Sequence, residues 1–242
     1  MSYLSIIIPA YNEERRIAST LQRMQDYLST KDFVWEIILV DDGSIDRTSE
    51  VARGMIRDER LTVIKNPINQ GKGYSVKKGV LASNGEVILF SDADLSTAIE
   101  ELDKMLLWIN NDYDIVIGSR ALPESIIAVN QPWYRQTMGR IFNLLVRTFI
   151  LKGFKDTQCG FKCFKREAAI KVFNLLQLTG FAFDVEILFV ARRFGLKIKE
   201  LPVKWINSPE SKVHLVKGSL SMFLELFKII YYDWRRYYNQ VL

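Results

Sequence analysis

The chain has 242 residues, of which 48% are hydrophobic and 25% charged, so it can bury a full core and is not a mainly disordered chain. This length is long for one domain and short for two ordinary ones. Lysine and arginine total 33 against 28 acidic residues, which gives a net charge of +5. Such a modest excess suits a phosphate-bearing ligand or an anionic membrane surface, and it is far below the charge density of a dedicated nucleic-acid-binding protein.

Cysteine and histidine are scarce. The two cysteines, Cys159 and Cys163, exclude a disulfide framework, and together with the one histidine they exclude most zinc-binding patterns. A catalytic centre built on histidine would have to use His214. No basic leader precedes the first apolar run, and no uncharged run approaches the ~20 apolar residues of a membrane-spanning helix. We therefore expect neither a targeting segment nor a spanning helix.

Strand-like and helix-like stretches alternate through the first half of the chain. Short runs rich in β-branched residues predict strands at 3–9, 35–41, 61–65, 86–91 and 114–119. The spacing of apolar residues predicts helices at 13–29, 48–57, 72–83 and 98–110. Nearly continuous apolar strands are typical of a mainly parallel sheet that helices cover on both faces. We predict an α/β domain over residues 1–212, followed by an amphipathic helix within 213–242.

Polar clusters follow four of the predicted strands: Pro9-Ala10-Tyr11-Asn12-Glu13-Glu14, Asp41-Asp42-Gly43-Ser44, Asp92-Ala93-Asp94 and Gly118-Ser119-Arg120. Loops favour Asp, Gly and Ser for purely structural reasons, and for the second cluster alone that explanation is the better one. The carboxyl ends of parallel strands, however, meet at the edge where such sheets bind ligands. Like charges gathered there cost energy unless a cation or a ligand neutralises them. Together the four clusters predict a ligand site.

Asp92 and Asp94 are the candidate metal ligands, because they directly follow a predicted strand. Two carboxylates at a strand end can bind one Mg²⁺ or Mn²⁺ ion, and the phosphates of a ligand would complete its oxygen shell. The metal would offset the charge that develops on a departing diphosphate. Gly71-Lys72-Gly73 lacks the P-loop spacing, and no G-x-G-x-x-G follows the first strand, which disfavours a Walker-type NTPase and a dinucleotide oxidoreductase.

The chain resembles the family-2 inverting glycosyltransferases of the GT-A fold. The four strand-end clusters and Asn69-Gln70-Gly71-Lys72-Gly73 occur in the order and at the intervals of that family. Three later motifs are similar to those of dolichyl-phosphate β-glucosyltransferases, with polyprenyl-phosphate mannosyltransferases as near relatives: Asp156-Thr157-Gln158-Cys159-Gly160-Phe161-Lys162, Phe181-Ala182-Phe183-Asp184-Val185-Glu186 and Ser211-Lys212-Val213. Ser96 stands where mannosyl relatives tend to carry glutamine. The resemblance spans residues 3–213 and implies a GT-A nucleotide-diphospho-sugar transferase fold, in which helices flank a mainly parallel sheet.

The resemblance also implies roles for individual residues. Asp92 and Asp94 would hold the metal on the sugar diphosphate. Arg120 and Arg135 would bind the lipid phosphate through paired guanidinium bonds, and Lys212 would meet a phosphate from the far side. The nucleotide-sugar pocket would be formed by Pro9, Tyr11, Glu13, Asp41, Asp42, Lys72 and Asp92. The implied catalytic residues are Asp92, Asp94, Arg120 and Arg135.

A phosphate acceptor would simplify the chemistry. A phosphate monoester has a second pKa near ~6, so its oxygen is an anionic nucleophile at neutral pH and needs no general base. Catalysis would consist of positioning and electrostatics, with inversion at the anomeric carbon. Asp184 and Glu186 stand where relatives with hydroxyl acceptors carry a base. We expect them to contact sugar hydroxyls or to fix a loop, the alternative being a solvated or capping pair at the start of a helix over 184–194.

Residues 213–242 are rich in aromatic side chains. Helical spacing predicts one apolar face made of Leu220, Phe223, Leu224, Phe227, Tyr231, Trp234 and Tyr238. Residues 137–151 form a second amphipathic stretch. Amphipathic segments with aromatic and basic residues suit a membrane interface, although packing on the domain or on a second subunit, as in a homodimer, fits each segment equally well. We expect a peripheral protein on the cytoplasmic face of a membrane.

The leading hypothesis is the metal-dependent transfer of glucose from UDP-glucose to a polyprenyl phosphate of the dolichyl type. A second hypothesis keeps the fold but uses GDP-mannose. A third is a catalytically inactive module that binds a nucleotide sugar or a lipid phosphate, against which the intact Asp92, Asp94, Arg120 and Arg135 speak.

Overall fold

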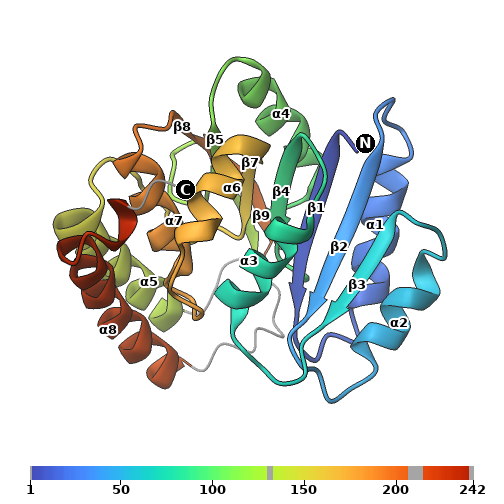
Figure 1. The fold of residues 1–242 in the computed structure, drawn as a ribbon, viewed down its shortest axis with the longest axis horizontal. Coiled ribbons are helices and arrows are strands. Elements are labelled where there is room, and N and C mark those ends of the chain that lie inside the picture. Colours follow the sequence, from blue (N-terminus) through green and yellow to red (C-terminus); the bar gives the residue numbers. More distant parts are fainter. Residues whose placement is uncertain (1, 130–132, 207–214, 240–242) are drawn as a thin grey trace.

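A seven-stranded sheet with helices on both faces forms the centre of the molecule (Figure 1). The computed structural model describes the backbone of residues 2–129, 133–206 and 215–239, and the side chains of these except 133–136, 140 and 215–221. The strands lie in the order β3 (Leu61–Lys65), β2 (Trp35–Asp41), β1 (Leu4–Ala10), β4 (Val87–Ser91), β7 (Phe161–Lys165), β5 (Ile115–Ser119) and β8 (Ile198–Pro202). A small parallel sheet pairs β6 (Ile126–Val129) with β9 (Lys204–Ile206). The predicted α/β fold with a mainly parallel sheet is confirmed.

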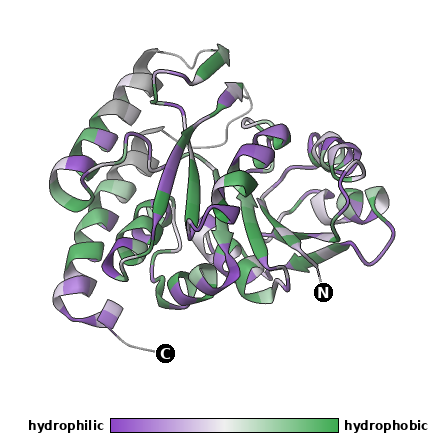
Figure 2. Ribbon diagram, turned by 90° about the horizontal axis from the view of Figure 1, so that it is seen from above, coloured by the Kyte–Doolittle hydropathy of each residue, from purple (hydrophilic) through white to green (hydrophobic). Residues whose placement is uncertain are grey.

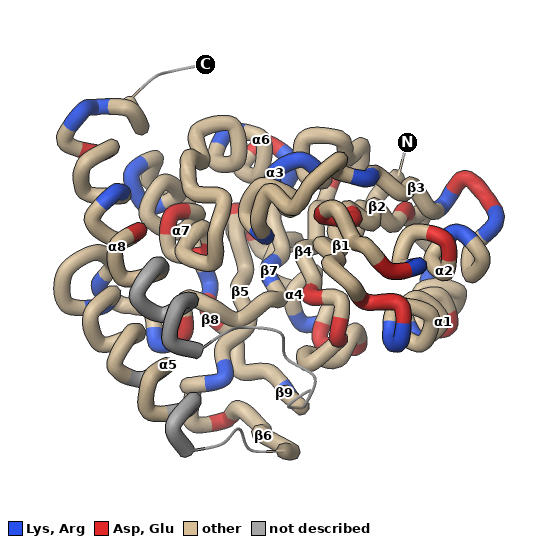
Figure 3. Tube along the Cα trace, turned by 90° about the horizontal axis from the view of Figure 1, so that it is seen from below, with Lys and Arg blue, Asp and Glu red and all other residues tan. Residues whose placement is uncertain are grey.

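The order in which the chain adds strands to the sheet reverses at β1. The chain runs outward from β1 to β2 and β3, then returns to place β4 on the other side of β1. In such sheets a crevice opens between the loops that follow the two strands at this switch point. Toward this edge, charged positions line the loops around β1, β4 and α3 (Figure 3). β7 runs antiparallel to both β4 and β5, so its amino end, instead of its carboxyl end, lies beside the end of β4.

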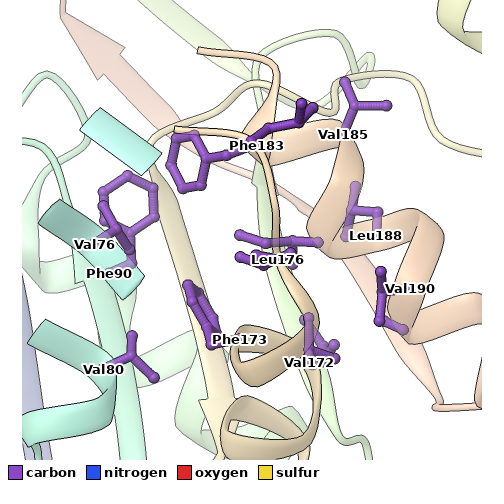
Figure 4. Close-up of a cluster of buried hydrophobic side chains, with 14 of the residues drawn as sticks. Val76, Val80, Phe90, Val172, Phe173, Leu176, Phe183, Val185, Leu188 and Val190 are labelled. Carbon is purple, nitrogen blue, oxygen red and sulfur yellow. The ribbon is translucent and has the colours of Figure 1, made fainter. Parts of the chain in front are cut away.

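Each face of the sheet has its own helices and its own buried cluster. One face is covered by α1 (Ile17–Leu28), α2 (Thr48–Met55) and α4 (Leu102–Asn110), the other by α3 (Lys72–Ala82), α6 (Arg166–Leu175) and α7 (Phe183–Arg193) (Figure 1). Along β1, Ile6 and Ile8 belong to the first cluster and Ile7 to the second. In the second cluster Phe90 packs against Phe183, with ring centroids 5.7 Å apart (Figure 4). Burial on both faces explains the apolar strands.

The remaining helices lie beside the second cluster: α5 (Trp133–Leu145), the π-helix η2 (Val146–Ile150), α8 (Leu215–Trp234) and the short 3-10 helix η3 (Tyr237–Asn239). Along the described part of α8, a few polar positions interrupt a mainly apolar helix (Figure 2). Leu226 and Ile229 of α8 and Tyr238 of η3 are buried in the cluster. The division into a domain and a separate C-terminal helix stays a prediction, and in this structure the two share one core. Among the described residues no helix combines the length and apolarity needed to cross a bilayer.

The predicted apolar face of residues 213–242 is divided between core and surface. Leu224, Phe227, Tyr231 and Trp234 do share an outward face, and each is at least half exposed. Tyr238 does not belong to it, because the chain leaves α8 after Trp234 and η3 turns this ring into the core. The prediction for Leu220 lies outside the described side chains. Helical periodicity identified the stripe but not which side of the helix packs on the protein.

Two predicted helices begin later than expected. α1 begins at Ile17 instead of residue 13, because Asn12 adopts a left-handed backbone (φ +55°) and its loop is bonded to the loop after β2. There the Asn12 N–H donates to Ser44 Oγ at 2.9 Å, and the Ile45 N–H donates to Asn12 Oδ1 at 2.9 Å. The helix predicted at 98–110 starts with a 3-10 turn, η1 (Ile99–Glu101), ahead of α4.

Two glycines test how closely α3 packs on the sheet. A Cβ at Gly79 of α3 would lie 2.5 Å from Ile7 Cγ2, whereas a Cβ at Gly54 of α2 would meet no atom within 4 Å. Alanine gains about 1 kcal/mol of helix propensity over glycine. Overpacking a core costs about 1–3 kcal/mol.

We expect Gly54→Ala to raise the free energy of unfolding and Gly79→Ala to lower it, although both changes favour the helix equally. Urea denaturation of both variants and of the parent chain measures the sign of each change in the free energy of unfolding. Stabilisation by Gly79→Ala would contradict the close packing of α3 on β1.

Candidate active site

The loops after β1 and β2 are joined to each other by backbone and side-chain bonds. The Asp42 N–H donates to the Ala10 carbonyl at 2.8 Å, which links the ends of β1 and β2. The Asp41 carboxylate accepts from the Ser44 N–H at 2.8 Å and from the Ser49 hydroxyl. Both aspartates are buried, so their negative charges are compensated inside the loops and not by solvent.

Asp42 joins the end of β2 to the start of α3. Its carboxylate accepts from the Gln70 N–H at 2.9 Å, the Gly71 N–H at 2.8 Å and the Asn66 side-chain amide at 2.8 Å. Gly71 has φ +101°, a conformation that glycine adopts readily, and it presents its N–H to the carboxylate. The role of Asp41 and Asp42 toward a base or ribose stays a prediction. What the structure adds is that Asp42 fixes the loop that carries Lys72.

The predicted pocket residues of the first loop differ in accessibility. Pro9 is half-buried near the end of β1, and Tyr11 is 40% exposed in the following loop. Glu13 is buried, and its carboxylate pairs with the guanidinium of Arg16, with Nη2 and Oε1 2.7 Å apart. Tyr11 is thus the most exposed of these three side chains.

Asp92 meets Lys72 directly beyond the end of β4. Lys72 Nζ lies 2.7 Å from Asp92 Oδ1, and the Asp92 N–H donates to the Gly160 carbonyl at 3.0 Å. A Cβ at Gly160 would lie only 2.0 Å from Asp92 Oδ2, so the carboxylate packs directly on that glycine. Asp94 Oδ1 accepts from the Ser96 N–H at 2.9 Å. Asp92 is therefore held by Lys72 and by Gly160.

The Lys72 ammonium is charged and surrounded by aromatic rings. It lies 5.2 Å from the ring centroid of Phe90 and 5.9 Å from those of Phe181 and Phe183. Burial disfavours the charged form, but the carboxylates of Asp92 and other acidic residues outweigh it and raise the pKa of Lys72. Ring faces attract cations. A fixed positive charge therefore lies at the first residue of α3, where a helix N-terminus also favours an anion.

Asp184 belongs to a buried ion pair behind this centre. Lys162 of β7 and Asp184 of α7 are both buried and bonded to each other, and Lys162 Nζ also donates to the Cys159 carbonyl at 2.7 Å. Burial raises the pKa of Asp184, although Lys162 and Lys72 favour its charged form. The alternative of a solvated Asp184 at the helix start is therefore wrong.

Glu186 fixes a loop. It is fully buried, and its carboxylate accepts from the backbone N–H groups of Gln177 and Leu178, each at 2.9 Å, and from the hydroxyl of Tyr238 at 2.6 Å. Burial raises the pKa of Glu186, and the bond from Tyr238 opposes that rise. Of the roles that the sequence left open for Glu186, the structure favours loop fixing, and the solvated alternative is wrong here as well.

Arg120 forms a two-bond pair with Asp156 at the end of β5. Arg120 Nε and Nη2 donate to the two Asp156 oxygens at 2.6 and 2.9 Å, and the guanidinium lies 5.7 Å from the ring centroid of Trp205. Burial raises the pKa of the Asp156 carboxyl, but Arg120 outweighs it, and the net pKa is lowered. These bonds use two of the five guanidinium N–H groups. Asp92 is close enough to contribute to the raised pKa of Arg120.

The structure thus brings Asp92, Asp94, Lys72, Asp184 and Arg120 to one edge of the sheet. The backbone of Arg135 lies in the first turn of α5, but its side chain lies outside the described part, as does Lys212. The sequence interpretation gave no role to Gly160 or Lys162. Both stand in a motif that the resemblance had singled out, and that motif was the available signal.

The carboxylates at the end of β4 suit a metal ion that is bound partly by the protein and partly by a bound substrate. Among the described residues no group of three or more His, Cys, Asp and Glu side chains converges as a self-sufficient metal site. Asp92 and Asp94 supply carboxylates from one loop, and Asp92 already has a cation, the Lys72 ammonium, as its neighbour. Mg²⁺ typically binds one or two carboxylates together with water and substrate phosphates. The residues therefore fit a divalent ion whose remaining ligands come from a diphosphate.

Comparison with solved structures identifies the fold. Glucosyl-3-phosphoglycerate synthase from Mycobacterium tuberculosis, in complex with UDP, superposes with a TM-score of 0.69 at 20% sequence identity, covering 94% of this chain and 80% of that one. Mannosyl-3-phosphoglycerate synthase from Rubrobacter xylanophilus gives the same TM-score at 17% identity, covering 100% and 76%. The fold is that of the GT-A glycosyltransferases.

The chain belongs to glycosyl transferase family 2, whose model matches residues 5–173. Dolichyl-phosphate β-glucosyltransferase of Dictyostelium discoideum is 37% identical over 240 residues, covering 94% of this chain and 73% of the relative. The human enzyme of the same name is 37% identical over 224 residues, covering 87% and 69%. The expected family and the expectation of a glycosyltransferase enzyme are confirmed.

Removing the Tyr238 hydroxyl should destabilise the fold in a pH-dependent way. Tyr238→Phe leaves a buried carboxylate with one donor fewer, which costs about 1–3 kcal/mol. Because the folded pKa of Glu186 is raised, this group favours folding most below its unfolded pKa of ~4.3 and loses that contribution as pH rises through the folded pKa. The variant raises the pKa further, so its cost should be larger at pH 7.5 than at pH 5.

Urea denaturation at both pH values measures this difference, with Tyr231→Phe as control because Tyr231 is 53% exposed. An equal cost of Tyr238→Phe at both pH values would contradict the assigned bond.

Proposed function

We propose that this enzyme transfers glucose from UDP-glucose to a polyprenyl phosphate of the dolichyl type, with inversion at the anomeric carbon. The observation that carries the proposal is the cluster of charged side chains at the end of β4, where Asp92 and Asp94 lie beside Lys72. The names of the relatives in Dictyostelium and human support glucose as the sugar and dolichyl phosphate as the acceptor.

In this proposal Lys72 binds the donor diphosphate directly, and Asp92 and Asp94 would hold a divalent cation on it. The glucosyl-3-phosphoglycerate synthase of the same fold was solved with Mn²⁺ and UDP-glucose, which supports a divalent cation and a UDP-sugar here. When bound, Mg²⁺ or Mn²⁺ would be held by Asp92 and Asp94 and would neutralise charge on the departing diphosphate. Lys72 adds a fixed positive charge at the N-terminus of α3, and Asp42 holds the loop that carries it.

Arg120 orients the acceptor phosphate in this proposal. Asp156 holds the guanidinium plane in place through two bonds, so its other N–H groups keep a fixed direction. The acceptor oxygen is anionic at neutral pH, so the reaction needs no general base. This agrees with Asp184, which is bonded to Lys162 and buried, a poor arrangement for a base. Arg135 and Lys212 are proposed as further phosphate ligands.

A panel of donors and acceptors tests the proposal. Purified protein with Mg²⁺ is incubated with UDP-glucose or GDP-mannose and with dolichyl or undecaprenyl phosphate, and the lipid product is detected by mass. We expect transfer from UDP-glucose, and a loss of at least ~100-fold in Asp94→Ala with an unchanged melting temperature. Transfer from GDP-mannose alone would contradict the proposed donor, and full activity of Asp94→Ala would contradict the metal site.

The proposed acceptor lies in a membrane, and we propose that the exposed apolar residues of α5, η2 and α8 dock on the cytoplasmic surface of that membrane. The outward face of α8 is flanked by the exposed cations Lys228, Arg235 and Arg236. This combination of apolar and basic side chains suits an anionic lipid surface. The exposed apolar residues are Ile141, Leu144, Phe149, Leu224, Phe227, Ile230, Tyr231 and Trp234. The free thiols of Cys159 and Cys163 agree with a reducing compartment.

Replacing two of these side chains should weaken membrane docking. We expect Phe227→Ser with Trp234→Ser to reduce co-flotation with vesicles containing anionic lipid by at least ~10-fold, because each buried apolar side chain contributes about 1.5–3 kcal/mol. Leu107→Ser, at an exposed position of α4, serves as control. Undiminished flotation would contradict the proposal, and a loss of dimerisation instead would assign the face to a second subunit.

A further inference from the structure

The loop at residues 177–182, between α6 and α7, packs backbone to backbone against the start of α3. The Thr179 carbonyl accepts from the Gly73 N–H at 2.8 Å and from the Tyr74 N–H at 3.4 Å. A Cβ at Gly71 would lie 2.4 Å from the same carbonyl oxygen. The first turn of α3 and this loop therefore cannot move independently, and Lys72 lies in that turn.

The other side of the loop is held by α8. Glu225 Oε2 accepts from the Ala182 N–H at 3.2 Å. A Cβ at Gly180 would lie 2.6 Å from Glu225 Oε1 and 2.9 Å from Oε2, so the carboxylate packs directly on the loop backbone. Glu225 is the inward neighbour of Leu224, which is 55% exposed. One helix thus has an outward apolar face and an inward carboxylate directed at the loop.

The loop also reaches the charged centre through its own side chain. The ring of Phe181 lies 5.9 Å from Lys72 Nζ, and Lys72 Nζ lies 2.7 Å from Asp92 Oδ1. A continuous set of contacts therefore runs from Glu225 of α8 through the loop to the Lys72 ammonium. The helix that the sequence predicted to lie at a membrane interface, or else to pack on the domain or on a second subunit, thus contacts the loop next to Lys72.

We propose that Glu225 is a positioning residue for the donor diphosphate, which it serves by holding the 177–182 loop against the start of α3 and so keeping Lys72 in place. This inference rests on the proposed function, because it takes the ligand of Lys72 to be a nucleoside diphosphate. It assigns two separable roles to α8. The inward side orders the donor site, and the outward side contacts the lipid surface.

UDP binding in the presence of Mn²⁺, measured by calorimetry on the whole chain in detergent, tests this role without requiring turnover. Glu225→Ala removes the acceptor of the Ala182 N–H, and we expect UDP affinity to fall about fivefold and the donor KM to rise in parallel, while kcat changes less. Glu225→Gln keeps an acceptor oxygen of the same reach and should bind UDP within about twofold of the parent chain.

Two further variants separate positioning from a general loss of structure. Gly180→Ala places a methyl group where the Glu225 carboxylate lies and should weaken UDP binding as Glu225→Ala does, even though Glu225 remains. Phe227→Ser, on the outward face, should leave UDP affinity unchanged while lowering vesicle binding.

Parent-level UDP affinity in Glu225→Ala would overturn the inference, as would equal weakening by Ala and Gln. If the parent chain itself bound no UDP, the proposed donor would fail, and with it the inference. If the parent chain and Glu225→Ala both bound UDP with the same affinity, the proposed donor would be retained and only the role of Glu225 would be rejected.

Discussion

At the carboxyl end of β4 the Asp92 carboxylate meets the Lys72 ammonium at 2.7 Å, and the surrounding strand ends and loops are arranged about this ion pair. A parallel sheet brings several strand ends to one edge, and in this chain those ends carry aspartates that would repel one another. Asp41 and Asp42 are compensated by loop N–H groups, and Asp184 by Lys162. Asp92 and Asp94 remain as the carboxylates that can bind a divalent cation, and the Lys72 ammonium lies beside Asp92.

Much of this arrangement could be predicted from the sequence, because it depends on local patterns. Apolar runs and helical spacing located β1 to β5 and α1 to α4 within a few residues, and the position of Asp92 and Asp94 after a strand indicated the site. The antiparallel strand β7 was not predicted, since strand direction depends on long-range pairing. That strand brings Gly160 and Lys162 to Asp92 and Asp184, so these two partners could not be foreseen.

The C-terminal segment shows a second limit of sequence patterns. Periodicity predicted an apolar stripe from 213 to 242, but a stripe alone does not state whether protein, lipid or a second subunit covers it. In the structure Leu226 and Ile229 face the core, Leu224 and Phe227 face outward, and Glu225 between them meets the 177–182 loop. A charged residue within an aromatic-rich helix was the one sequence signal of that inward contact.

Exhaustive chelation tests the central claim most directly, namely that neighbouring carboxylates at the end of β4 act through a divalent cation on the donor diphosphate. Sugar transfer to the lipid phosphate is followed in protein stripped with excess chelator, and again after Mg²⁺ or Mn²⁺ is restored. We expect turnover to fall to background and then to return. Turnover that continues at its original rate without divalent cations would contradict the account.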